Sequence, residues 1–228
     1  MDYVTLTAPK NTPGSLADFL NNSTLTAAAP FIIKEAESEI YRRLRHWRML
    51  TQPITGTLTV GNDFIPLPAD CLEPDIFMLT GTQQSWLDQK PIQEVMRRWS
   101  YDDAGNRTQQ QPVIYSFNQT NLVFDSVADQ AYPYALVYYQ QPPALSASNP
   151  TNFLTDVYPR MLRCAMMMQA TEWAKDSGVG QFDRTYWMQL LIEQIATAQA
   201  ESDRARRAVI SGEAFIGGGS GGAPVYSW

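Results

Sequence analysis

The hydrophobic pattern changes its period twice along the chain, and each change falls at a proline. From about residue 27 to 50 the apolar side chains recur at helical spacing, as Ile40 and Leu44 do. Between Pro53 and Pro143 they alternate or gather in the short runs typical of strands. Helical spacing then returns. Strands enclosed between helical segments predict an α+β fold, in which an antiparallel β module is inserted into a helical bundle.

These changes divide the chain into three expected parts. We expect an N-terminal arm with a short helix over residues 1–26, a main domain over 27–210, and an extended, flexible tail over 211–228 that contains a Gly/Ser linker. Within the main domain the expected helices are about 27–50, 159–176 and 181–210, and the β module is about 53–143.

The β module contains two hairpin patterns. Residues 57–60 alternate, Gly61 marks a turn, and residues 64–67 lead back, which predicts a first hairpin. Residues 113–117 and 122–124 predict a second one. Further strands are expected at 76–79 and 134–139, with a short helix at 91–99 between the hairpins.

The two later helices differ in their apolar faces. Apolar residues cover much of the circumference of the helix from about 159, which predicts a central place in the bundle and a buried thiol at Cys164. The last helix has a single stripe, formed by Trp187, Leu191, Ile195 and Ala198. The stripe weakens among the arginines at 204–207, so we expect that end to project past the core.

Charge and cysteine content exclude several classes of function. The net charge is -6 and the pI about 4.8, which disfavours general nucleic-acid binding because that needs a clustered positive surface. The two cysteines, Cys71 and Cys164, suggest neither a disulfide framework nor a metal site. We find no signal region at the N-terminus and no stretch apolar enough for a membrane span, so we expect synthesis in a reducing cytoplasm.

Residues that could carry catalysis each have a simpler interpretation. His46 is the one histidine and lacks a nucleophile motif, so a surface or interface position is expected. Three acidic pairs could serve as the acid and base of a glycosidase: Glu37 with Glu39, Asp102 with Asp103, and Glu172 with Asp176. A simpler interpretation is that Asp102 and Asp103 belong to a turn and that the other pairs lie on helix faces, where they are solvated or paired with basic residues. The glycine run at 217–222 lacks the Lys-Ser/Thr of a phosphate loop. We therefore expect no enzymatic activity, no cofactor and no metal.

Two features indicate binding to other proteins. Arg42, Arg45 and Arg48 recur at a spacing of three, which would form a row on one helix face. Such a row is either a solvated face or a contact with an acidic neighbour or a phosphate backbone, and an acidic chain favours an intersubunit contact. The tail carries apolar groups that are typical anchors, although a disordered terminus is the simpler interpretation: Phe215, Ile216, Val225, Tyr226 and Trp228.

Several segments, taken in order, resemble a known family. These are Ile65-Pro66-Leu67-Pro68-Ala69-Asp70-Cys71-Leu72-Glu73, then Leu136-Val137-Tyr138-Tyr139, Pro143-Ala144-Leu145-Ser146 and Asn149-Pro150-Thr151-Asn152-Phe153-Leu154, followed by helices. They are similar to segments in the head-to-tail adaptors, or tail accessory factors, of short-tailed bacteriophages. The resemblance covers roughly residues 27 to 200 and leaves out the glycine tail.

The resemblance implies a structural virion protein and no catalysis. Such adaptors form a ring of subunits, typically a dodecamer, that lies beneath the portal, connects it to the tail and helps retain the packaged DNA. The implied partners are the portal protein, other copies of the chain and a tail hub or nozzle protein below. DNA passes through the channel without sequence-specific binding, and an acidic ring would help it slide. The family commonly reaches the portal with an extended C-terminal segment, a place that residues 211–228 occupy here.

Two other functions remain open from the sequence. One is a peptidoglycan-degrading glycosidase associated with the tail, which would depend on one essential carboxylate. The other is an assembly factor that is absent from the mature virion. The implied location is the head-to-tail junction of a virion made in the cytoplasm of a bacterial host.

Overall fold

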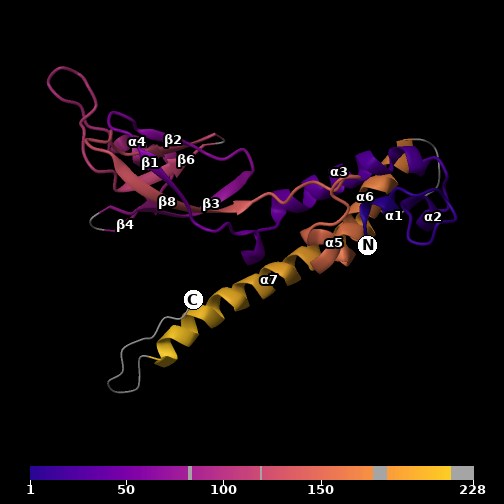
Figure 1. Ribbon diagram of the computed structural model, residues 1–228. Coiled ribbons are helices and arrows are strands. Elements are labelled where there is room, and N and C mark those ends of the chain that lie inside the picture. Colours follow the sequence, from indigo (N-terminus) through magenta and orange to yellow (C-terminus); the bar gives the residue numbers. More distant parts are fainter. Residues whose placement is uncertain (82–83, 119, 177–183, 217–228) are drawn as a thin grey trace. The chain divides into compact units, whose positions relative to one another are not determined.

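The computed structural model describes residues 1–81, 84–118, 120–176 and 184–216, with side chains described to residue 173 in the sixth helix and to residue 207 in the last. These residues form two compact units. Unit 1 combines Met1–Trp47 with Pro143–Trp228, and unit 2 is Arg48–Pro142 (Figure 1). Helices and two sheets are present, so the predicted α+β class is confirmed.

Unit 1 is helical. Two short helices, α1 (Tyr3–Leu6) and α2 (Leu16–Phe19), come first, and Leu6 and Leu16 are each only 2% exposed. The remaining helices of this unit are α3 (Leu25–Arg43), α5 (Phe153–Val157), α6 (Pro159–Asp176) and α7 (Arg184–Ile216). The N-terminal arm therefore packs its apolar side chains against the unit.

Helix α6 is the centre of unit 1, as its sequence predicts. It contacts α3 and α7, and apolar residues on nearly all of its sides are buried, among them Met161, Leu162, Ala165 and Met168. Cys164 is buried too, and burial raises the pKa of its thiol. On α7 the expected stripe is confirmed at Leu191, Ile195 and Ala198, and it continues to Ser202.

Helix α3 ends at Arg43, well before the residue 50 that the sequence predicts. Leu44 turns into an extended conformation with φ -85° and ψ 127°. The chain then buries both Leu44 and His46, at 0% exposure each. A continuing helix would separate these two residues by about 200° around its axis. The extended turn lets both side chains enter the core.

Unit 2 contains two four-stranded sheets. The first has the order β1 (Ile54–Leu58), β8 (Tyr132–Gln140), β3 (Cys71–Leu79) and β4 (Ser85–Trp86). The second has the order β2 (Phe64–Pro66), β7 (Asn121–Phe124), β6 (Ile114–Phe117) and β5 (Asp88–Gln89). A 3₁₀ turn, η1 (Trp47–Met49), leads into β1, and the short helix α4 (Ile92–Arg97) follows β5.

The first predicted hairpin is wrong, and the second is confirmed. β1 pairs with β8 and β2 pairs with β7, so the two segments of the expected hairpin lie in different sheets. The turn at Gly61, with φ 83°, carries the chain from one sheet to the other. Leu58 and Ile65 thereby enter the same core from the two layers. β6 and β7 pair antiparallel as predicted, whereas β5 runs parallel to β6.

Both sheets contribute to one buried cluster. Phe77 of β3 lies at its middle, with ring centroids 5.7 Å from Tyr115 and 5.4 Å from Phe124 on the other sheet. Aromatic pairs at such distances contribute about 0.5–1.5 kcal/mol beyond their buried area. Among the described helices of the chain, none is long and apolar enough to span a membrane.

Candidate interaction surfaces

The three arginines expected to form one row do not share a helix. Arg42 lies in the last turn of α3, where it pairs with Glu39 and keeps 69% of its side chain exposed. Arg45 follows the helix end, and its Nη1 donates to the carbonyls of Tyr41 at 2.8 Å and Leu44 at 2.9 Å. Arg48 belongs to η1 in unit 2. The early end of α3 therefore breaks the row, and Arg45 caps the carbonyls of the helix end.

The anchors expected in the tail fall mostly outside the described residues. Val225, Tyr226 and Trp228 lie there. Phe215 and Ile216 belong to the backbone of α7, which extends past the expected end at residue 210, and their side chains are outside the described set.

Unit 1 contains a buried carboxylate, that of Glu37 on α3, which is 3% exposed. It accepts a hydrogen bond from Asn152 Nδ2 at 2.6 Å and from the Leu145 N–H at 3.1 and 3.3 Å. Burial raises the pKa of this carboxyl, while the two donors act in the opposite direction. Both of these donors are neutral amides. The prediction that Glu37 is either solvated or paired with a basic side chain is therefore wrong.

Asn152 connects this carboxylate to helix α5, which the sequence analysis missed. Its side-chain oxygen accepts from the N–H groups of Leu154 and Thr155, and Thr155 Oγ1 accepts from the Asn152 N–H at 2.8 Å. This is a reciprocal capping box with Thr in the position that Glu or Gln usually takes. The Asn-x-x-Thr spacing at residues 152–155 is the sequence signal for this helix start.

His46 is buried, which contradicts the surface or interface position expected for it. Its Nε2 lies 3.0 Å from the hydroxyl of Tyr158, and that hydroxyl also lies 2.8 Å from Glu201 Oε2 on α7. The rings of Phe153 and Trp47 lie 5.4 and 5.9 Å from the imidazole. A hydroxyl has one proton, and that of Tyr158 is donated to Glu201. The Tyr158 oxygen can therefore only accept from His46, which places a proton on Nε2 of the imidazole.

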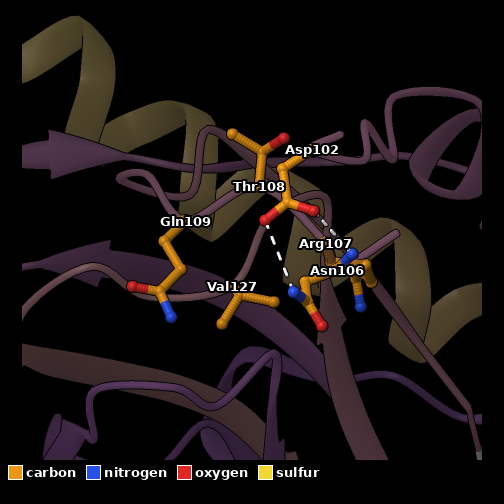
Figure 2. Close-up of a pocket in the computed structure, with 6 residues that line it drawn as sticks. All are labelled: Asp102, Asn106, Arg107, Thr108, Gln109 and Val127. Carbon is orange, nitrogen blue, oxygen red and sulfur yellow. Dashed lines mark hydrogen bonds between the residues drawn. The ribbon is translucent and has the colours of Figure 1, made fainter. Parts of the chain in front are cut away.

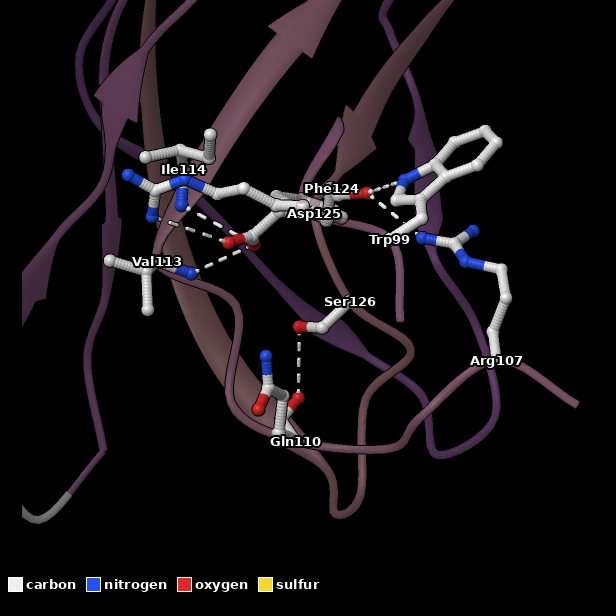
Figure 3. Close-up of polar contacts among 9 residues, drawn as sticks. Trp99, Arg107, Gln110, Val113, Ile114, Phe124, Asp125 and Ser126 are labelled. Atoms are coloured by element: carbon white, nitrogen blue, oxygen red, sulfur yellow. Dashed lines mark hydrogen bonds and ion pairs between the residues drawn. The ribbon is translucent and has the colours of Figure 1, made fainter. Parts of the chain in front are cut away.

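A long connection in unit 2, residues 98–113, is held at its base by polar contacts (Figure 3). Asp125, 4% exposed, accepts from the N–H of Val113 at 3.0 Å and of Ile114 at 3.4 Å. Arg107 pairs with Asp63 and lies 4.1 Å from the ring centroid of Trp99. These contacts fix the connection against the second sheet.

An open hollow of about 560 Å³ lies on this connection (Figure 2), lined by Asp102, Asn106, Arg107, Thr108, Gln109 and Val127. The carboxylate of Asp102 is used in hydrogen bonds within its own turn, where it accepts from the Ala104 and Asn106 N–H groups at 3.0 and 2.8 Å. The turn predicted at residues 102–106 is thus present.

Glu172, another candidate catalytic acid, forms an ion pair with Arg184 at 3.2 Å. In the described parts of the chain no three His, Cys, Asp or Glu residues could hold a metal ion.

Comparison with known protein families identifies the family of this chain. The family model described as SU10 adaptor protein matches residues 14–212, most of the chain. The chain belongs to the SU10 adaptor protein family. No curated protein matches the sequence.

Membership in the SU10 adaptor family confirms the resemblance to phage head-to-tail adaptors. It gives the chain a structural role at the head-to-tail junction of a virion. It also implies contacts with portal and tail proteins, and the family is one of structural adaptors.

The segments that carry the resemblance serve the fold. Asp70 accepts from the Tyr138 hydroxyl at 2.9 Å and from Gln140 Nε2 at 2.6 Å, which joins the start of β3 to the end of β8. Asn149 Nδ2 donates to the carbonyls of Pro143 and Ala144 at 3.3 and 3.0 Å, and Asn152 binds Glu37. In this SU10 adaptor chain the family segments therefore hold loops in place by hydrogen bonds.

Proposed function

We propose that this chain forms a ring, a dodecamer, beneath the portal of a bacteriophage, where it connects the portal to the tail and helps retain packaged DNA. The single observation that carries this proposal is the length of α7. Its buried stripe reaches Ser202, and the helical backbone continues to Ile216 (Figure 1). At 1.5 Å per residue the continuation is about 20 Å long. The described turn after Ser202 carries exposed charged side chains, among them Asp203, Arg204 and Arg207, and an exposed helical end of this kind is suited to contact another protein.

Apolar side chains of the C-terminal segment and three arginines make the contacts with other proteins. The C-terminal segment, residues 211–228, docks on the portal through apolar anchors, namely Phe215, Ile216, Val225, Tyr226 and Trp228. Arg42, Arg45 and Arg48 contribute to contacts between subunits. Arg42 has the best support because 69% of its side chain is exposed, while Arg45 acts by holding the end of α3. A tail hub or nozzle protein binds the opposite side of the ring, and the acidic charge keeps DNA mobile in the channel.

Truncation tests the docking segment. A chain that ends at Ile216 loses the linker and the final anchors, and a chain that ends at Ser211 also loses Phe215 and Ile216. We expect both to keep the helical circular dichroism of the full chain, because the described core lies before residue 211. Binding to purified portal should weaken by at least about tenfold, measured by interferometry. Unchanged binding by the chain that ends at Ser211 would contradict the proposal.

A matched pair of tail variants separates anchoring from general loss of sequence. Tyr226→Ser with Trp228→Ser removes two aromatic anchors, whereas Ser227→Ala changes the residue between them. We expect only the aromatic double variant to lose portal affinity. Mass analysis of purified virions tests the location, since an assembly factor would be missing from them.

A further inference from the structure

The four sheet edges of unit 2 differ in how well they are protected against pairing with another strand. β2 is three residues long and ends in Pro66, and β4 and β5 have two residues each. Short strands and prolines are the usual means by which proteins protect sheet edges. β1 has neither, since it spans Ile54–Leu58 and pairs on one side with β8. Its other side pairs with no strand among the described residues.

β1 also lacks charge, the other common form of edge protection. No Asp, Glu, Lys or Arg occurs from residue 49 to 62. Ile54 is 40% exposed, Thr55 and Thr57 are exposed, and Leu58 is 1% exposed. The edge therefore offers unpaired backbone groups and a partly exposed apolar side chain, with no charged group to repel an approaching strand.

The sequence of β1 is nearly symmetric about its middle residue. It reads Ile54-Thr55-Gly56-Thr57-Leu58. If a second β1 lies antiparallel and centred on Gly56, Ile54 of one copy faces Leu58 of the other, and Thr55 faces Thr57. Side chains alternate between the faces of a strand, so the apolar pairs fall on one face and the threonine pairs on the other. Threonine pairs across strands are favourable, and the partly exposed Ile54 would gain apolar cover from the second strand.

Gly56, at the centre of that register, has no room for a side chain. A Cβ atom at this position would lie 2.4 Å from the hydroxyl of Tyr134, its neighbour on β8. The tyrosine ring thus covers the glycine on the core side. This arrangement keeps the register of an edge strand defined although its central residue has no side chain.

We propose that β1 is a self-association strand, through which two copies of this chain pair antiparallel about Gly56 and join their first sheets into one sheet of eight strands. The contact relates two identical surfaces by a two-fold axis, so it differs from the head-to-tail contacts that close a ring. This pairing is separate from the adaptor function, because it forms between free copies of the protein before they enter the ring. A five-residue strand pair contributes modestly, so the dimer dissociates readily and leaves the protomers available for assembly.

Cysteine pairing tests the register directly. In a Cys71→Ser background, Thr55→Cys and Thr57→Cys are prepared as two separate full-length variants. Directly opposite positions have Cβ atoms about 4.5–5.5 Å apart, whereas position 55 of one copy and position 55 of the other would be diagonal neighbours at about 7–8 Å. Disulfides form only across the shorter separation. We expect the oxidised mixture to form covalent dimers several-fold faster than either variant alone. Equal rates in the three samples would overturn the proposed register.

Sedimentation equilibrium of the full chain tests the association without cysteines. We expect a concentration-dependent dimer that Thr55→Lys weakens at least about tenfold, because lysine is the residue that most often protects edges. Thr120→Lys places the same charge in the exposed turn before β7 and should leave the dimer unchanged. A monomer at all concentrations, or association that Thr55→Lys does not weaken, overturns the proposal. Portal binding is measured separately, so a failure of the adaptor function gives a different result.

Discussion

The side-chain amide of Asn152 lies 2.6 Å from the carboxylate of Glu37, although 115 residues separate the two in sequence. Both side chains are buried, at 8% and 3% exposure. This contact joins α3 to the start of α5, so the loop from Pro143 to Asn152 is held at both ends. Breaking it removes a donor from the buried carboxylate, which keeps the Leu145 N–H, and so leaves this charge less well satisfied in the core of unit 1.

Asn152→Ala should therefore destabilise the protein strongly. The variant removes the cap of α5, a change that costs about 0.5–2 kcal/mol, and also removes a donor to a buried carboxylate. We expect a total loss of about 2–4 kcal/mol in the free energy of unfolding, measured by urea denaturation. Thr151→Ala, at the exposed neighbouring position, is the control and should change stability by less than about 0.5 kcal/mol. Similar stabilities for the two variants would refute this role of Asn152.

The stability that Glu37 provides should depend on pH. Its pKa in the folded protein is raised above the usual 4.5, so the folded state holds this proton more tightly than the unfolded state. The contribution is then fully present below pH 4.5 and is lost as the pH rises through the raised pKa. The difference in unfolding free energy between the wild type and Glu37→Gln should decrease over that window. A difference that stays constant from pH 4 to about 8 would contradict the raised pKa.

Tyr158→Phe should weaken the contact that joins the segment after α3 and the α5–α6 junction to α7. The hydroxyl of Tyr158 bridges His46 and Glu201, so its loss leaves the buried imidazole without this partner. We expect a loss of about 1–3 kcal/mol in unfolding free energy, which thermal and urea denaturation both measure. Tyr101→Phe removes a hydroxyl from a residue that is 59% exposed and serves as the control. Equal effects of the two substitutions would show that the bridge contributes nothing.

Asp125→Ala should destabilise unit 2. Two backbone N–H groups, of Val113 and Ile114, lose their shared acceptor, and an unpaired buried donor costs about 1–3 kcal/mol. Hydrogen exchange should show faster exchange at Val113 and Ile114. Asp103→Ala changes an exposed carboxylate in the turn at 102–106 and should leave both measurements unchanged. Unaltered protection at Val113 in the Asp125 variant would disprove the role given to this carboxylate.

Local patterns predicted the elements that one segment can specify alone. The circumferential burial of α6 and the stripe of α7 followed from helical spacing, and the β6–β7 hairpin followed from two runs joined by a short turn. The prediction failed where distant residues decided the structure. Residues 57–60 and 64–67 read as a hairpin, yet β1 found its partner in β8, more than 70 residues away. The continuation of α3 to residue 50 failed because burial of His46 required an extended turn at Leu44.

The candidate binding groups show the same division. The sequence indicated Arg42, Arg45 and Arg48 by their spacing, but spacing has this meaning only on a continuous helix, and α3 ends at Arg43. It carried no sign that Glu37 would be buried against Asn152, because a charged residue on a helix is normally solvated. By itself the sequence determined the α+β class, the positions of most elements and the family, since these depend on local periodicity and ordered motifs. Only the tertiary structure decided strand partners, the end of α3 and the buried polar pairs, because each depends on which distant groups are available to satisfy hydrogen bonds and fill the core.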